Sequence, residues 1–201
     1  MIPDDILAEA HRYWCGHLPT AEYFPEEKAA IWFERSEATD TEIFTMFGPF
    51  LDAVAANNWV LADLDRTEIV GLVIMLDQFP RNIFRADKRA FAYDETARRH
   101  ARAAIAAGVG RFALVERVFL YLPFEHSEAI EDQDLSVRLF EELLAAAPAE
   151  QTETYKDYLV FAEKHRDLIR RFGRFPHRNA WLGRENTPEE DAFLAEHGRG
   201  Y

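Results

Sequence analysis

Apolar residues recur at intervals of three and four along most of this chain, which is the period of an amphipathic helix. Ile43, Phe47, Leu51 and Val54 form one such face. With its flanking caps and breakers, the pattern predicts about nine helices, over residues 4–15, 25–33, 40–55, 68–79, 87–107, 112–122, 127–147, 152–172 and 188–197. No two segments have the alternation and the turn of a β-hairpin. We therefore expect an all-α fold of helices packed as antiparallel pairs.

Single residues predict where several of these helices begin and end. Thr39 and Thr187 each open a capping box, in which a Glu three residues later reaches back to the cap. Gly173 is expected to end the helix over 152–172 in a left-handed conformation. Pro80 and Pro123 are expected to end the helices before them, because proline has no N–H for the helical ladder.

Residues 68–79 are apolar on nearly every side, which is typical of a central buried helix. The run over 69–74 is also rich in β-branched residues and suits a buried strand equally well. No neighbouring segment offers a strand to pair with it, so we favour the helix.

Length and composition indicate one domain over residues 1–201. Cys15 is the one cysteine, so no internal disulfide is possible, which fits a reducing compartment. The start of the chain is acidic and lacks the apolar run of a signal peptide. The longest apolar run, Ile69–Leu76, is too short for a bilayer, which needs about 20 residues. We therefore expect a cytoplasmic protein that does not enter a membrane.

The net charge of −13 argues against nucleic-acid binding, which requires a basic face. Basic residues are nevertheless concentrated in two segments, over 81–117 and 164–185. These segments either neutralise acidic parts of the fold or converge on an anionic ligand.

Three segments carry polar residues that an ordinary solvated helix face does not explain. The first is Asp77–Asn82, at the end of the most hydrophobic predicted helix, where a charge must be paired if it is buried. Asp77 and Arg81 suit a mutual ion pair across Pro80. They also suit a site, with Asp77 as an acid–base or orienting group and with Arg81 and Asn82 as ligand-binding groups.

The second segment contains His126, Ser127 and Glu128. Ser127 is expected to cap the following helix, and Glu128 is favoured near a helix N-terminus by the dipole. Capping does not explain His126. We therefore regard His126 and Glu128 as candidate catalytic residues, with a purely structural histidine as the alternative.

The third segment is the densest in arginine and histidine. A helix C-terminus favours cations and accounts for several of them. It does not account for residues beyond Gly173. From this segment we select His177 as a catalytic candidate and, as ligand-binding candidates, His165, Arg174, Arg178 and Asn179.

Common catalytic and cofactor motifs are missing from the sequence. There is no His-Glu-x-x-His pattern, no glycine-rich phosphate loop and no Gly-x-Ser-x-Gly elbow. We therefore expect no cofactor and no metal. One alternative is a metal site made by His126, His165 and His177 with Glu128 or Asp167.

These segments also carry a family resemblance. Its motifs are Asp-Gln-Phe-Pro-Arg-Asn at 77–82, Glu-Arg at 116–117, His-Ser-Glu at 126–128, residues 165–179, and Leu-Gly-Arg-Glu at 182–185 before Thr-Pro-Glu-Glu. Together they resemble domain-of-unknown-function family 924, which is largely bacterial. The resemblance extends from about Ala29 to Leu194. It implies an all-α fold similar to the tetratricopeptide superfamily and no established activity.

Two functional hypotheses follow. In the first, the polar segments surround a pocket for a small anionic molecule, with His126 or His177 as proton carrier if the site is catalytic. In the second, the chain is a helical scaffold for a protein or peptide partner, and its Arg, Asp and Glu residues lock helices together. Arginines already held by protein carboxylates favour the second hypothesis. Whether the protein is an enzyme stays open, and self-association is a further alternative.

Overall fold

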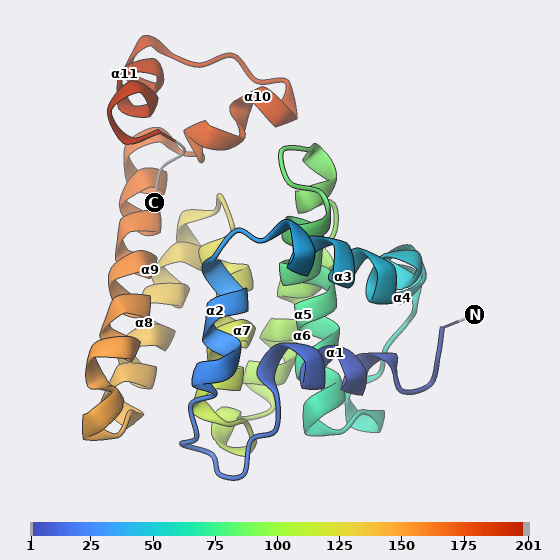
Figure 1. The fold of residues 1–201 in the computed structure, drawn as a ribbon. Coiled ribbons are helices and arrows are strands. Elements are labelled where there is room, and N and C mark those ends of the chain that lie inside the picture. The colour runs from blue at the N-terminus through green and yellow to red at the C-terminus, as the bar shows by residue number, and fades with distance from the viewer. Residues whose placement is uncertain (1, 199–201) are drawn as a thin grey trace. The chain divides into compact units, whose positions relative to one another are not determined.

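The computed structural model describes residues 2–198, and all regular structure within that range is helical (Figure 1). The all-α prediction is therefore confirmed. The α-helices are α1 (Ile6–Cys15), α2 (Glu26–Phe33), α3 (Glu37–Phe47), α4 (Leu51–Ala56), α5 (Arg66–Ile83), α6 (Asp94–Ala106), α7 (Leu114–Glu125), α8 (Ile130–Ala146), α9 (Thr152–Phe172), α10 (Asn179–Leu182) and α11 (Pro188–His197). Short 3₁₀ turns cover 48–50, 61–63, 88–91, 109–111, 149–151 and 176–178.

The chain divides into two compact units. The first consists of Met1–Arg85 and Arg89–Pro123, and the second of Ala86–Lys88 and Phe124–Tyr201. The prediction of a single domain over 1–201 stays a prediction, and each unit is described below by itself. No helix between residues 2 and 198 combines the length and the apolar character needed to cross a bilayer.

Helix α5 is the centre of the first unit. Helices α1, α3 and α6 pack against it, and every residue from Ile69 to Pro80 is buried. The strand alternative for this segment is therefore wrong. An aromatic cluster surrounds Phe79, whose ring lies 5.6 Å from Trp14 and 4.6 Å from Phe47. These contacts bring the N-terminal helix onto the middle of the chain.

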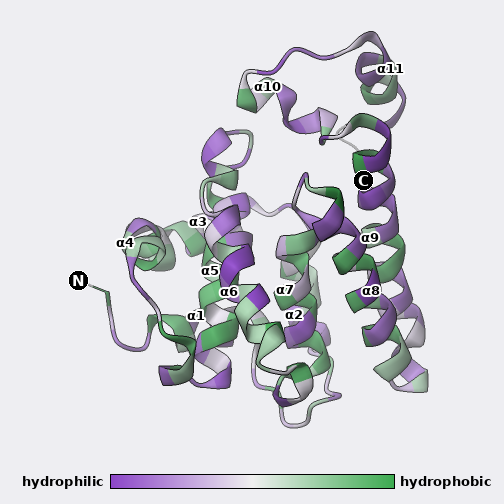
Figure 2. Ribbon diagram, turned by 180° about the vertical axis from the view of Figure 1, so that it is seen from behind, coloured by the Kyte–Doolittle hydropathy of each residue, from purple (hydrophilic) through white to green (hydrophobic). Residues whose placement is uncertain are grey.

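The second unit is built on the α8–α9 hairpin. Figure 2 shows hydrophobic and hydrophilic residues alternating along α9, as expected for an amphipathic helix. Beyond Gly173, which has the predicted left-handed conformation (φ 69°), Phe175 and Phe193 join the end of α9 in a small core. The capping box at Thr187 is confirmed at the start of α11. The hairpin is an antiparallel pair, while the wider tetratricopeptide-like arrangement stays a prediction.

Several predicted helix boundaries are wrong. Pro80 lies inside α5 and Pro123 inside α7, rather than at their ends. Ser36, not Thr39, caps α3, and its side chain accepts a hydrogen bond from the Thr39 N–H. Ser127 does not cap α8, which begins at Ile130; its hydroxyl donates to Asp132 instead. The single helix expected over 87–107 is a 3₁₀ turn followed by α6.

Candidate functional site

Asp77 is completely buried on α5 and is surrounded by donors. Gln78 Nε2 donates to its carboxylate at 2.6 Å. Arg81 lies 3.3 Å from the other carboxylate oxygen and also donates to the Asp77 backbone carbonyl at 2.7 Å. The ion pair between Asp77 and Arg81 is therefore present, as the structural alternative predicted.

Arg81 is held from a second side by α6. Its Nη1 and Nη2 donate to the two carboxylate oxygens of Asp94 at 2.8 and 2.9 Å. This bidentate geometry is the strongest that an arginine forms with a carboxylate. Arg81 therefore joins α5 to α6 and has both terminal nitrogens occupied.

Asn82, the next predicted binding residue, faces α3. Its side-chain amide donates to Asp40 Oδ1 at 2.9 Å, and Arg85 binds both oxygens of the same carboxylate. Asn82 and Arg85 thus fasten the end of α5 to α3.

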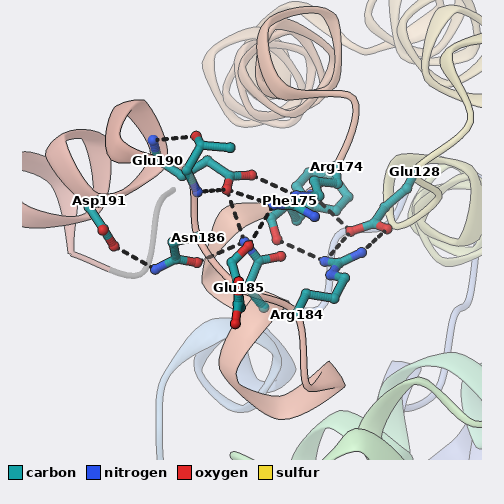
Figure 3. Close-up of polar contacts among 10 residues, drawn as sticks. Glu128, Arg174, Phe175, Arg184, Glu185, Asn186, Glu190 and Asp191 are labelled. Carbon is teal, nitrogen blue, oxygen red and sulfur yellow. Dashed lines mark hydrogen bonds and ion pairs between the residues drawn. The ribbon is translucent and has the colours of Figure 1, made fainter.

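In the second unit, Glu128 is the centre of a polar network (Figure 3). Arg184 binds its two carboxylate oxygens at 2.7 and 2.9 Å, and the Phe175 N–H donates to it at 2.8 Å. Burial alone would raise the pKa of Glu128, but these hydrogen bonds outweigh it and lower the pKa. Glu128 is therefore an ionised anchor for the segment after α9.

Arg174 and Glu190 form a second pair in this network (Figure 3). Two Arg174 nitrogens donate to the Glu190 carboxylate at 2.7 and 2.8 Å, and Asn179 Nδ2 lies 3.3 Å from it. Glu190 also accepts from the Thr187 N–H as the third residue of the capping box. The hydrogen bond from Arg174 is the largest of the causes that lower the pKa of Glu190 to about 2.

The side chain of Arg178 is joined to the backbone of His126. Arg178 Nη1 donates to the His126 carbonyl at 2.9 Å. The guanidinium lies 4.4 Å from the centre of the Phe175 ring, a cation–π distance. Arg178 thereby connects the 3₁₀ turn over 176–178 to the end of α7.

Two histidines, His165 and His177, each have their ring centre 5.5 Å from the centre of the Phe175 ring. His165 Nδ1 lies 2.7 Å from the buried Glu125 carboxylate and 2.9 Å from the Phe161 carbonyl. Burial, followed by the charge of Arg178, lowers the pKa of His177 to about 3, so His177 is neutral at neutral pH.

Several of the candidate residues selected from the sequence lie close together, and they all belong to the second unit. The second-unit candidates lie around Phe175: His126, Glu128, His165, Arg174, His177, Arg178 and Asn179. Asp77, Arg81 and Asn82 belong to the first unit. Across residues 2–198, no three His, Cys, Asp or Glu side chains are placed to share one metal ion.

A different group of residues, not selected from the sequence, lines a depression of about 320 Å³ in the first unit. His11 and Arg12 come from α1, His17 follows α1, and Arg66 and Thr67 begin α5. Ala8, Gly16 and Leu18 complete the lining. The lining contains two arginines and two histidines and no carboxylate.

A buried ion pair lies behind this depression. Glu116 on α7 is fully buried, and its Oε1 is 2.6 Å from His11 Nε2. Its Oε2 accepts from the Ala113 N–H at 2.7 Å and lies 3.5 Å from Arg66 Nη1. A buried carboxylate that fixes one nitrogen of a histidine is an arrangement typical of acid–base sites.

Comparison with known proteins decides the family. The family model described as "Bacterial protein of unknown function (DUF924)" matches residues 11–198. The chain belongs to the DUF924 family. A solved structure, of a protein of unknown function from Agrobacterium tumefaciens, is 34% identical, with 94% of this chain and 97% of that chain covered and a TM-score of 0.75. No curated protein matches the chain.

In this DUF924 protein, one sequence signal pointed to the depression. Glu116 and Arg117, the family motif at 116–117, are two charges between Val115 and Val118 on an otherwise apolar stretch. A charge in such a place must be paired inside the protein. Its partner, His11, is 105 residues away, so sequence spacing gave no means of finding it.

Proposed function

We propose that this protein binds a small anionic molecule, and that the depression lined by His11, Arg12, His17 and Arg66 is the binding site. The single observation that carries the proposal is the chemistry of this lining: four basic side chains and no acidic one, in a chain of net charge −13. Arg and His side chains supply donors for the oxygens of a phosphate or carboxylate.

The exposure of the two arginines that line the depression supports this location. Arg12 is exposed and has no carboxylate partner among the described residues, and the Arg66 side chain is 36% exposed. The volume of about 320 Å³ matches the smaller ligand sites of proteins. A phosphate-sized or short carboxylate ligand therefore fits better than a nucleotide.

Three arginines, two of them selected from the sequence as ligand-binding candidates, support the second hypothesis, a helical scaffold for a protein or peptide partner. Arg81, Arg174 and Arg184 each bind a carboxylate through two nitrogens. Arg81 joins α5 to α6, and Arg174 and Arg184 join the segment after α9 to α11 and to the residues before α8. We therefore keep the scaffold as a second candidate, in which these residues contribute rigidity rather than ligand contacts.

Calorimetric titration of the whole chain with sulfate, phosphate and malonate tests the anion site. We expect binding by the parent protein and a loss of about tenfold in affinity for Arg12→Ala, since one charge-assisted hydrogen bond contributes about 1.5 kcal/mol or more. Arg99→Ala is the matched control, because Arg99 is an exposed arginine of the same unit that lines a different depression, on α6.

Two results would contradict the proposal. If none of the three anions binds, the depression is not an anion site and the scaffold gains support. If Arg99→Ala weakens binding as much as Arg12→Ala, the anion is attracted by general surface charge. Thermal unfolding of both variants checks that each remains folded.

A further inference from the structure

His11 stands between a buried carboxylate and the proposed anion site. Resting on that proposed function, we propose that the anion is bound together with one proton, held between His11 Nδ1 and an oxygen of the ligand. This makes the ligand a small oxyanion, a phosphate or a carboxylate, and makes His11 the acid–base group of the site.

The tautomer of His11 follows from its contact with Glu116. Nε2 lies 2.6 Å from Glu116 Oε1, and an ionised carboxylate offers only acceptors. The proton of the neutral ring is therefore on Nε2. Glu116 is fixed in turn by the Ala113 N–H and by Arg66, so this orientation is built into the fold.

The other ring nitrogen then decides how an anion is received. With Nε2 carrying the proton, Nδ1 of a neutral His11 is an acceptor, and His11 borders the depression. Two acceptors repel, so an anionic oxygen beside Nδ1 requires a proton between them. Either the ring becomes an imidazolium or the ligand keeps a hydroxyl.

The charges around His11 determine when that proton is taken up. Glu116 from α7 and Asp65, which caps α5, favour the imidazolium. Arg66 from α5 and Arg12 and His17 from the α1 side oppose it when they are charged. A bound anion neutralises these opposing charges, so binding and protonation of His11 reinforce each other.

The consequence is that a proton lies between His11 Nδ1 and the ligand oxygen, where acid–base catalysis on the ligand would use it. A histidine supported by a buried carboxylate can give a proton to a ligand oxygen or accept one from it. Arg12 and Arg66 hold the oxyanion while that exchange takes place. In this arrangement Glu116 is a positioning residue, because it acts through His11 and does not touch the ligand.

The test is calorimetry of sulfate binding between pH 5 and pH 8. Sulfate does not titrate in this range, so a proton taken up on binding must go to the protein. Repeating each titration in buffers of different ionisation enthalpy gives the number of protons. We expect sulfate binding to take up a proton and to strengthen as the pH falls, by up to about tenfold in affinity per pH unit.

Two variants locate the proton. His11→Gln keeps an amide donor for Glu116 but cannot titrate, so its sulfate binding should take up no proton at any pH. His17→Gln should still take up the proton for each sulfate bound, whatever its affinity. Uptake that is lost in His17→Gln and kept in His11→Gln would overturn the assignment.

The outcomes separate this inference from the proposed function. Sulfate binding that depends on Arg12 but takes up no proton would leave the anion site intact and refute the role of His11. No binding of sulfate, phosphate or malonate would refute both. Titration with malonate beside phosphate shows which oxyanion the site prefers. Nitrogen NMR of the free protein gives an independent check, since a His11 proton on Nδ1 would also refute the inference.

Discussion

Gly71 on α5 lies directly against the backbone of Leu7 on α1. A Cβ at Gly71 would stand 1.8 Å from the Leu7 carbonyl oxygen and 2.7 Å from its carbonyl carbon. Both atoms are backbone, so no side chain can move aside to make room. The two helices can cross at this distance only with glycine at position 71.

Gly71→Ala is therefore expected to destabilise the first unit by about 3 kcal/mol or more, the upper range for overpacked cores. Urea unfolding followed by circular dichroism measures the loss. Gly110→Ala is the control, because a Cβ there meets no atom within 4 Å and the position has no positive φ. It should change stability by less than about 0.5 kcal/mol. Equal effects of the two substitutions would contradict the close helix crossing.

Arg81→Ala should destabilise the protein by about 3–5 kcal/mol, since it leaves the fully buried Asp77 charge without its cation. Arg85→Ala removes a similar pair with Asp40, but the Arg85 side chain is 32% exposed. Its loss should cost about 1 kcal/mol or less. The free energies of unfolding in urea compare the two, and a small effect of Arg81→Ala would show that Asp77 is protonated.

Low pH should reduce the stability of the second unit, because it protonates Glu190 and Glu128. Both have a lower pKa in the folded chain than the ordinary 4.5, Glu190 through the hydrogen bond from Arg174 and Glu128 through those from Arg184 and the Phe175 N–H. As the pH falls, these two carboxylates are therefore protonated at a higher pH in the unfolded chain than in the folded chain. Stability is fully present above about pH 4.5 and is lost as the pH falls toward about 2.

Glu190→Gln should be less stable than the parent at pH 7 and should approach it in stability near pH 2. Urea unfolding at pH 7, 4 and 3 follows the difference. Glu189→Gln is the neighbouring control, because Glu189 pairs with Arg171 in an exposed position. A constant gap between Glu190→Gln and the parent at every pH would contradict the low pKa of Glu190.

His177 gives a second pH effect, at less acidic pH. Its pKa falls from 6.5 to about 3 on folding, mainly because of burial. Between these two pH values, the unfolded chain binds a proton on His177 and the folded chain does not. Stability is complete above about pH 6.5 and decreases as the pH falls toward about 3. In His177→Gln, the decrease between pH 6.5 and pH 4.5 should be smaller. An unchanged slope would contradict a buried neutral His177.

Two signals confined to a few neighbouring residues predicted helix ends correctly. Gly173 ends α9 with φ 69°, and Thr187 caps α11 through the predicted box. In both cases the conformation is set by residues within one helical turn. Tertiary packing has little to change there, because the glycine has no side chain and Thr187 and Glu190 satisfy each other's backbone donors.

Where tertiary packing can override a local sequence signal, that signal was a poorer predictor of the fold. Pro80 costs α5 one hydrogen bond, but every residue from Ile69 to Pro80 is buried and the helix continues to Ile83. The Arg81 side chain supplies a donor to the Asp77 carbonyl close to the missing N–H. Burial of this apolar stretch outweighs a penalty of about 3 kcal/mol. The sequence around Pro80 indicates the penalty but not the packing that offsets it.

The candidate site was predicted least well, because its contacts join distant segments. An ion pair with Arg81, four residues away, was one of two alternatives for Asp77, and this pair is present. Glu128 was a catalytic candidate, but Arg184, 56 residues later, occupies both of its oxygens. Residue type and spacing reveal that a charge needs a partner without revealing which distant partner packing selects.

The Glu116–His11 contact also has a consequence for how the chain folds during synthesis. Helix α1 is synthesised before both of its main attachments, α5 and Glu116. At about 5–20 residues per second, the 105 residues between His11 and Glu116 take about 5–20 s to synthesise. Until α5 has also been made, the apolar face of α1, with Trp14 and Leu7, lacks the helix that covers most of it. The apolar face of α1 is therefore exposed on the nascent chain until α5 follows it, and its contact with Glu116 completes the packing last.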